Sequence, residues 1–155
     1  STYCLNEPCL QFQGIAIITI KDAVNVADYV DLVLSFYVGC ESLNINDQLM
    51  VYYGSANDSF FTNAATINGV DCGSKNVILP VDDNVKSALL VRFMFNPDLE
   101  TRELRYLYLD HVILSGTLKD TKTATHGERS QVPSTLPSTR SVVPTVTPTQ
   151  ATNMP

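Results

Sequence analysis

The chain has 155 residues, of which 45% are hydrophobic, enough for one domain with a sizeable apolar core. Residues 1–120 hold 7 Lys and Arg against 15 Asp and Glu, a formal charge of −8. An acidic surface repels polyanions and releases no counterions from them, which excludes nucleic acids and anionic bilayers as expected partners. No apolar stretch approaches the ~18 residues that cross a bilayer, so we expect no direct membrane insertion by these residues.

Apolar and polar residues alternate along seven stretches of the chain. This period-two pattern predicts β-strands, because successive side chains of a strand point to opposite faces. We expect no amphipathic helix. The predicted strands are Leu10–Phe12, Gly14–Ile20, Val30–Val38, Gln48–Tyr53, Asn76–Val81, Ala88–Phe95 and Leu104–Leu114.

Two of these strands also predict which side chains form the core. In each of them the apolar residues fall on one face, which should pack inside the protein. Arg92 falls on the opposite face of its strand, so we expect it at solvent or against a carboxylate. The predicted core residues are Val30, Leu32, Leu34, Phe36 and Val38 in the first strand and Leu89, Val91, Phe93 and Phe95 in the second.

Turn-forming clusters at Asn57, Asn68 and Asp71 separate the predicted strands. Short strands with turns between them predict an all-β, antiparallel β-sandwich, because a parallel α/β sheet needs long helical crossovers. A closed barrel is the alternative architecture. The sandwich domain is expected over residues 1–118.

The strand pattern ends before residues 119–155. Of the 35 residues from Thr121 to Pro155, 18 are Ser, Thr or Pro, and none is aromatic. Such a segment buries too little apolar surface to offset its ordering entropy, so we expect a disordered tail. Its composition predicts an O-glycosylated, mucin-like stalk, with an unmodified linker as the alternative.

Four cysteines and one N-glycosylation sequon predict an oxidising, extracellular setting. The cysteines are even in number, and the sequon begins at Asn57. Of the three possible pairings we favour Cys4 with Cys9 and Cys40 with Cys72, while four reduced thiols in a cytosolic protein remain the alternative. The cysteines lack the paired spacing of a zinc site. We therefore expect a secreted or cell-surface glycoprotein.

Several of these stretches also resemble a known group of extracellular jelly rolls. The stretches are Phe36–Glu41, Gln48–Ser55, Leu89–Phe93 and Tyr108–Gly116. Their order is similar to that in reelin subrepeats, and the last stretch resembles the final strand shared by reelin subrepeats, MAM domains and galactose-binding-like carbohydrate-binding modules. The resemblance implies a jelly-roll β-sandwich over most of the domain.

The resemblance further implies a structural Ca²⁺ site at Asp110, which occupies the position of the acid in that final strand. Hard carboxylate oxygens suit Ca²⁺, and an acidic domain raises the local cation concentration. The alternative is an Asp110 that pairs with Arg92 or Arg105. Nothing in the sequence selects among the further acids that could share the ion, which are Asp22, Asp28, Glu41 and Asp47.

Alternation places Tyr106 and Tyr108 on the same strand face as Asp110. They are candidates for an exposed strip that stacks on a glycan, with half-buried sandwich tyrosines as the alternative. Nucleophile-elbow, zinc-hydrolase and phosphate-loop motifs are absent from the sequence, so we expect no enzyme activity. The expected function is a noncatalytic extracellular recognition or adhesion module that binds a protein or glycan. The alternative is a carbohydrate-binding module linked to a catalytic domain.

Overall fold

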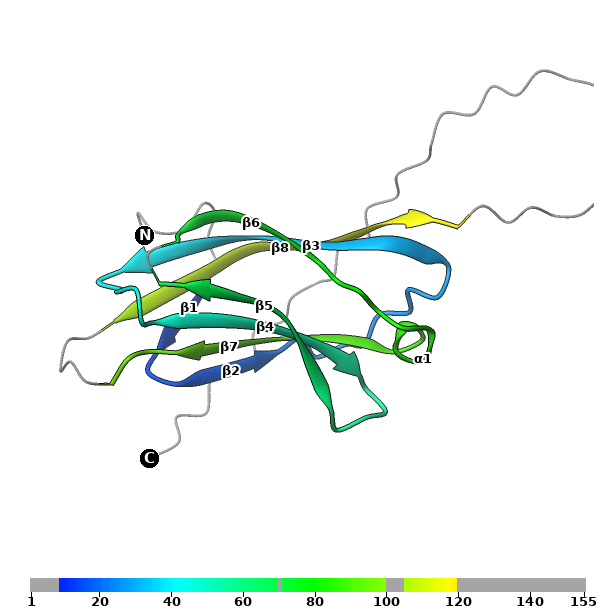
Figure 1. The fold of residues 1–155 in the computed structure, drawn as a ribbon, viewed down its shortest axis with the longest axis horizontal. Helices are drawn as coiled ribbons and strands as arrows, with labels where there is room; N and C mark the ends of the chain where they lie inside the picture. The colour runs from blue at the N-terminus through cyan, green and yellow to red at the C-terminus, as the bar shows by residue number, and fades with distance from the viewer. Residues whose placement is uncertain (1–8, 70, 100–104, 120–155) are drawn as a thin grey trace, which may run out of the picture.

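The computed structural model describes residues 9–69, 71–99 and 105–119, and these residues form a two-layered β-structure (Figure 1). They contain eight strands and one helical turn. The elements are β1 (Leu10–Gln13), β2 (Ala16–Thr19), β3 (Tyr29–Glu41), β4 (Gln48–Ser55), β5 (Phe61–Asn68), β6 (Gly73–Ile78), α1 (Asp83–Lys86), β7 (Leu89–Asn96) and β8 (Tyr106–Leu118). The predicted stalk lies outside the described residues apart from Lys119.

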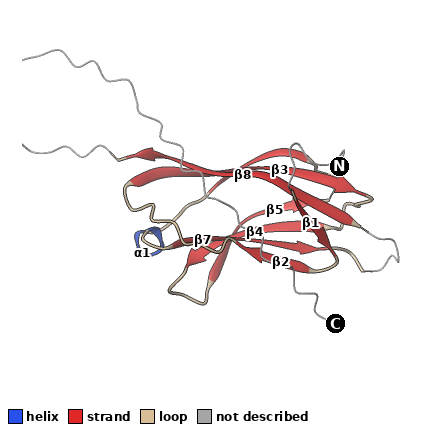
Figure 2. Cartoon of the chain, turned by 180° about the vertical axis from the view of Figure 1, so that it is seen from behind, coloured by secondary structure: helices blue, strands red, loops and turns tan. Residues whose placement is uncertain are grey.

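The strands form two four-stranded antiparallel sheets that face each other (Figure 2). Sheet A has the order β1-β8-β3-β6, and sheet B has the order β2-β7-β4-β5. The first strand therefore pairs with the eighth, the second with the seventh, the third with the sixth and the fourth with the fifth. This pairing is that of a jelly roll. The predicted antiparallel jelly-roll sandwich is confirmed, and the alternative closed barrel is wrong because the strands divide into two separate sheets.

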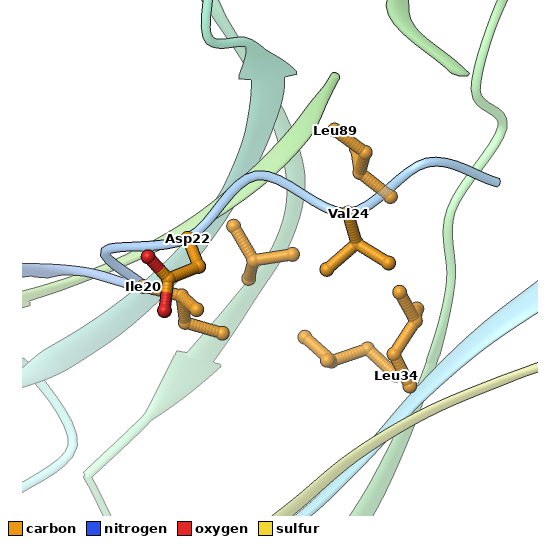
Figure 3. Close-up of a pocket in the computed structure, with 7 residues that line it drawn as sticks. Ile20, Asp22, Val24, Leu34 and Leu89 are labelled. Atoms are coloured by element: carbon orange, nitrogen blue, oxygen red, sulfur yellow. The ribbon is translucent and has the colours of Figure 1, made fainter. Parts of the chain in front are cut away.

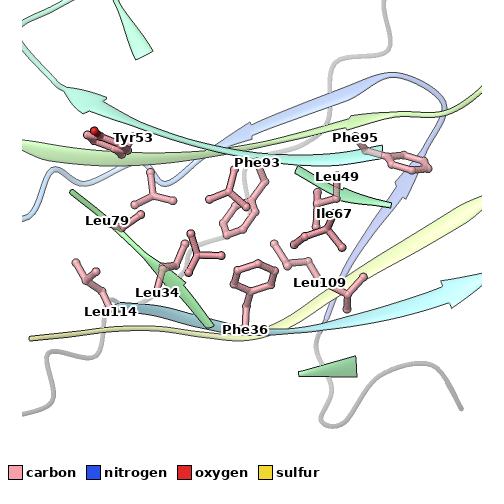
Figure 4. Close-up of a cluster of buried hydrophobic side chains, with 14 of the residues drawn as sticks. Leu34, Phe36, Leu49, Tyr53, Ile67, Leu79, Phe93, Phe95, Leu109 and Leu114 are labelled. Atoms are coloured by element: carbon pink, nitrogen blue, oxygen red, sulfur yellow. The ribbon is translucent and has the colours of Figure 1, made fainter. Parts of the chain in front are cut away.

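The core lies between the two sheets, where side chains of both inner faces meet (Figure 4). Phe36 of sheet A and Phe93 of sheet B make an edge-to-face ring contact with centroids 5.3 Å apart. A second such contact joins Phe12 and Phe95 at 6.4 Å. The predicted core is confirmed for Leu32, Leu34, Phe36 and Val38 of β3 and for Leu89, Val91, Phe93 and Phe95 of β7.

Val30 is the predicted core residue that is only half-buried. The pairing of β3 with β8 shifts register between Val30 and Val33, and Asp31 adopts φ +51° at this irregularity. A β-bulge of this kind inserts one extra residue and so reverses which side chains face inward. Strict alternation from Val30 to Val38 therefore cannot hold.

Strand β5 was not among the predicted strands. Its sequence, Phe-Thr-Asn-Ala-Ala-Thr-Ile-Asn, is polar, and Ile67 is its only residue in the buried core. It lies at the edge of sheet B and carries a register irregularity against β4. An edge strand with little buried surface has only a weak hydrophobic alternation, so the sequence pattern does not predict β5.

The Cys40–Cys72 disulfide is confirmed, with Cα atoms 6.0 Å apart. It connects the end of β3 to the residue before β6, so it crosslinks two neighbouring strands of sheet A at one end of the sheet. Cys9 is also disulfide-bonded. Its predicted partner, Cys4, lies outside the described residues.

Candidate functional site

The outer face of sheet B differs in charge from the rest of this acidic domain. Strands β2, β4, β5 and β7 contain no Asp, Glu, Lys or His, and Arg92 of β7 is their only charged residue. Strands of sheet A, in contrast, carry Asp31, Glu41 and Asp110. Sheet B thus presents an almost uncharged surface with one cation.

A shallow hollow of about 240 Å³ lies on this outer face and is open to solvent. We call it the Arg92 hollow. It is formed by side chains of all four strands of sheet B and of the turn between β4 and β5. Its lining residues are Ile17, Tyr52, Ser59, Phe61, Arg92 and Met94.

Arg92 is held in place by two neighbours. Its Nε–H donates a hydrogen bond to Thr19 Oγ1 at 3.0 Å, across the pairing of β2 with β7. Its guanidinium carbon lies 3.8 Å from the centre of the Phe61 ring, a cation–π contact. Among the described residues, no carboxylate forms an ion pair with Arg92. The predicted outward direction of Arg92 is confirmed. The sequence predicts either solvent or a carboxylate beside it, and no carboxylate of the described residues pairs with it.

Local sequence explains why these side chains meet. Arg92 and Met94 alternate along β7 with the core residues Val91 and Phe93, so both must point outward. Phe61 lies opposite Gly54 in the pairing of β4 with β5. A Cβ atom on Gly54 would come within 2.6 Å of the Phe60 carbonyl oxygen and 3.2 Å of the Phe61 ring. A glycine is therefore required where the Phe61 ring crosses β4.

The predicted tyrosine strip lies on the outer face of sheet A. Leu107 and Leu109 of β8 belong to the core, so Tyr106 and Tyr108 point outward as the alternation predicts. Tyr108 is nevertheless only 8% exposed, and its hydroxyl donates a hydrogen bond to Glu41 Oε2 at 2.7 Å. The expectation that Tyr108 belongs to an exposed strip is wrong, and Tyr106 is half-buried, as the alternative of half-buried sandwich tyrosines states. Their binding role stays a prediction.

Asp110, the predicted calcium ligand, is 8% exposed. Its Oδ1 accepts a hydrogen bond of 2.6 Å from the backbone N–H of His111, which adopts φ +55° at the second irregularity in the pairing of β3 with β8. No group of three or more His, Cys, Asp or Glu residues suited to a metal ion occurs in the part of the chain that the structure describes. The calcium site therefore remains a prediction for Asp110.

Asp47, one of the possible calcium co-ligands, has a different partner. It is fully buried and forms an ion pair with Arg105 of the segment before β8. Its carboxylate also accepts backbone hydrogen bonds from Asn44 at 2.6 Å and from Asp98 at 2.7 Å. Asp47 thus joins the β3–β4 loop to the β7–β8 connection. The two arginines suggested as partners of Asp110 therefore have other contacts, Arg105 with Asp47 and Arg92 with Thr19 and Phe61.

Asn57, the predicted glycosylation site, lies in the exposed turn between β4 and β5. Its backbone N–H donates a hydrogen bond to Ser55 Oγ at 3.2 Å, and its side chain is accessible to solvent. Ser59, the third residue of the sequon, lines the Arg92 hollow. A glycan on Asn57 would therefore lie next to the hollow.

A second space lies between the sheets and is too small for a ligand (Figure 3). It has a volume of about 10 Å³, and its walls are almost entirely apolar, formed by residues such as Val24, Leu34 and Leu89. A water molecule requires about 10–15 Å³ and two or more polar partners, so this space is a packing gap.

The sequence pointed to only one feature of the candidate site, the outward direction of Arg92. The missing signal was the absence of acidic residues from strands β2, β4, β5 and β7, which becomes visible only once these strands are known to be neighbours.

Within the described residues, no helix has the length and apolar character needed to span a bilayer. Comparison of the chain with protein-family models, with curated proteins and with solved structures found no match. The resemblance to reelin subrepeats, MAM domains and carbohydrate-binding modules thus stays a prediction.

Proposed function

We propose that the chain is a noncatalytic extracellular recognition module that binds its partner through the Arg92 hollow. The observation that carries this proposal is the hollow itself, an open depression lined by Ile17, Phe61 and Met94 around one immobilised arginine. Apolar and aromatic walls with a few placed polar groups are the usual composition of a binding site. Ile17 is 54% exposed, so its apolar surface is available to a partner.

An extracellular location is supported by the Cys40–Cys72 disulfide, because such crosslinks persist mainly in oxidising compartments. The exposed sequon at Asn57 agrees with this location. In the proposed arrangement, residues 119–155 form a glycosylated stalk that holds the sandwich away from an anchor or a neighbouring domain. The domain binds without chemical turnover.

The proposal is tested by measuring binding of the full chain, produced in a secretory host, to arrays of extracellular proteins and glycans. The informative variant is Met94→Asp, which places a charge in the hollow. Ile113→Asp is the matched control, because Ile113 is also a half-buried outward residue of a central strand, in sheet A.

We expect Met94→Asp to weaken binding to the identified partner at least tenfold, and Ile113→Asp to leave it unchanged, with both variants folded by near-UV circular dichroism. Equal binding by both variants would refute the hollow as the interface. Failure of the wild-type chain to bind any extracellular protein or glycan would refute the proposed function.

A further inference from the structure

We infer that the Arg92 hollow recognises a carboxylate that a partner protein presents beside an apolar side chain, as in an Asp or Glu next to an aliphatic or aromatic residue. This inference rests on the proposed function and names the chemistry of its partner. It predicts that a neutral or cationic group in the place of this carboxylate binds more weakly.

The first argument is charge. Ion pairs satisfy three of the six basic residues in the described part of the chain, and the other three are Arg92 and the surface lysines Lys21 and Lys119. The pairs are Lys75 with Asp71, Lys86 with Asp83 and Arg105 with Asp47. Arg92 is therefore the one arginine of the described residues whose charge has no carboxylate beside it, although the domain has an excess of acids.

The second argument is the direction in which Arg92 can still donate. Its Nε–H is used by Thr19, and one face of its guanidinium is covered by Phe61. Neither terminal nitrogen has a hydrogen-bond acceptor among the described residues, and both belong to a side chain that lines the hollow. The paired N–H groups of a guanidinium match the two oxygens of a carboxylate, and among the unmodified side chains only Asp and Glu offer that pair of charged acceptors.

The third argument is preorganisation. The hydrogen bond to Thr19 and the contact with Phe61 restrain the long arginine side chain before any partner arrives, which lowers the entropy lost on binding. Ile17 and Met94 are apolar side chains of the hollow that a bound partner would cover, and an ion pair is stronger once water is excluded from it. The same two side chains offer a surface to an apolar neighbour of the carboxylate.

The fourth argument concerns size and polarity. A volume of about 240 Å³ is below the ~300–1,000 Å³ of sites that enclose a whole small molecule, so the hollow accommodates one or two side chains. A sugar would need several polar groups for its hydroxyls. Of the lining residues with polar groups, Tyr52 already donates its hydroxyl to Met50 Sδ at 3.2 Å, so only Ser59 and Arg92 remain as side-chain donors, with the Tyr52 oxygen as an acceptor. A protein segment fits this lining better than a glycan does.

The test uses two short peptides that differ only in charge, acetyl-Glu-Phe-amide and acetyl-Gln-Phe-amide, titrated into the isotope-labelled full chain. The readouts are NMR shifts of the Ile17 and Met94 methyl groups and of Arg92 Nε–H. We expect the Glu peptide to shift all three signals and to bind about tenfold more tightly than the Gln peptide, as a charge-assisted bidentate contact requires.

The Arg92→Gln variant should bind both peptides equally weakly. Lys21→Gln is the matched control, because it removes the same charge from an exposed residue outside the hollow and should keep the tenfold preference. Thermal unfolding of both variants checks that they remain folded. Sialyllactose forms a third arm, since it carries a carboxylate on a sugar.

Equal affinity of the two peptides for the wild-type chain would overturn the inference, and so would a response of the same signals to sialyllactose alone. If the Met94→Asp variant loses its partner while the peptides are not distinguished, the hollow is an interface but not a carboxylate site. If the peptides are distinguished but no extracellular partner is bound, the proposed function fails and the carboxylate site stands.

Discussion

The buried ion pair of Asp47 with Arg105 predicts a large loss of stability when its acidic member is removed. The perturbation is Asp47→Ala. Asp47 is fully buried, Arg105 is 5% exposed, and the two residues lie 58 positions apart in the chain. Their contact therefore links the β3–β4 loop to the β7–β8 connection, which are far apart in the sequence.

The magnitude follows from the three hydrogen bonds that the Asp47 carboxylate accepts. Its loss removes the acceptor of the Arg105 guanidinium and of the backbone N–H groups of Asn44 and Asp98. Breaking a buried pair by removing one partner costs about 3–5 kcal/mol, because the Arg105 guanidinium stays buried and keeps its hydrogen bond to the Asp98 carbonyl oxygen but loses the Asp47 charge. The free energy of unfolding of a small domain is only about 5–15 kcal/mol, so a loss of this size should be easy to measure.

The assay is equilibrium unfolding in urea, with the midpoint and the m-value compared between variants. Asp28→Ala is the matched control, because Asp28 is exposed and its backbone carbonyl, which accepts a hydrogen bond from Lys119, is unchanged by the substitution. We expect the control to lie within about 0.5 kcal/mol of the wild type. The double variant Asp47→Leu/Arg105→Met should lose less than the sum of its single variants, because both charges leave together.

A loss below about 1 kcal/mol for Asp47→Ala, at an unchanged m-value, would refute the reasoning, because it would match an exposed ion pair. An additive double variant would likewise show that the two side chains are not coupled.

Three further predictions concern the disulfide, a close backbone contact and calcium. Removing the disulfide by Cys40→Ala/Cys72→Ala should cost about 4 kcal/mol in urea unfolding, because the crosslink joins residues 32 apart, and unchanged stability would contradict this. Gly69→Ala should cost about 1–3 kcal/mol in the same assay, because the added Cβ would lie 2.5 Å from the Asn44 carbonyl oxygen; a neutral effect would contradict that contact. If Asp110 binds Ca²⁺, millimolar calcium should raise the Tm of the wild type and not that of Asp110→Asn, and equal responses would exclude Asp110 as a ligand.

The fold class was predictable because a strand shows its buried face directly in its own residues. Leu89, Val91, Phe93 and Phe95 alternate without interruption, and all four are in the core. The pattern fails where the backbone departs from regular pairing, as at the bulge beside Val30, or where a strand buries little, as in β5. Neither a bulge nor an edge position leaves a strong mark on local alternation.

The sequence by itself determined the strand character of the chain, the core-facing residues of two of its strands, the acidic charge of the domain and the favoured pairing of Cys40 with Cys72. Only the tertiary structure decided that Arg92 lies over Phe61 and that Asp47 meets Arg105. The reason is that alternation tells which face of its own strand a residue occupies, whereas its neighbours on that face belong to strands chosen by the packing of the whole sandwich.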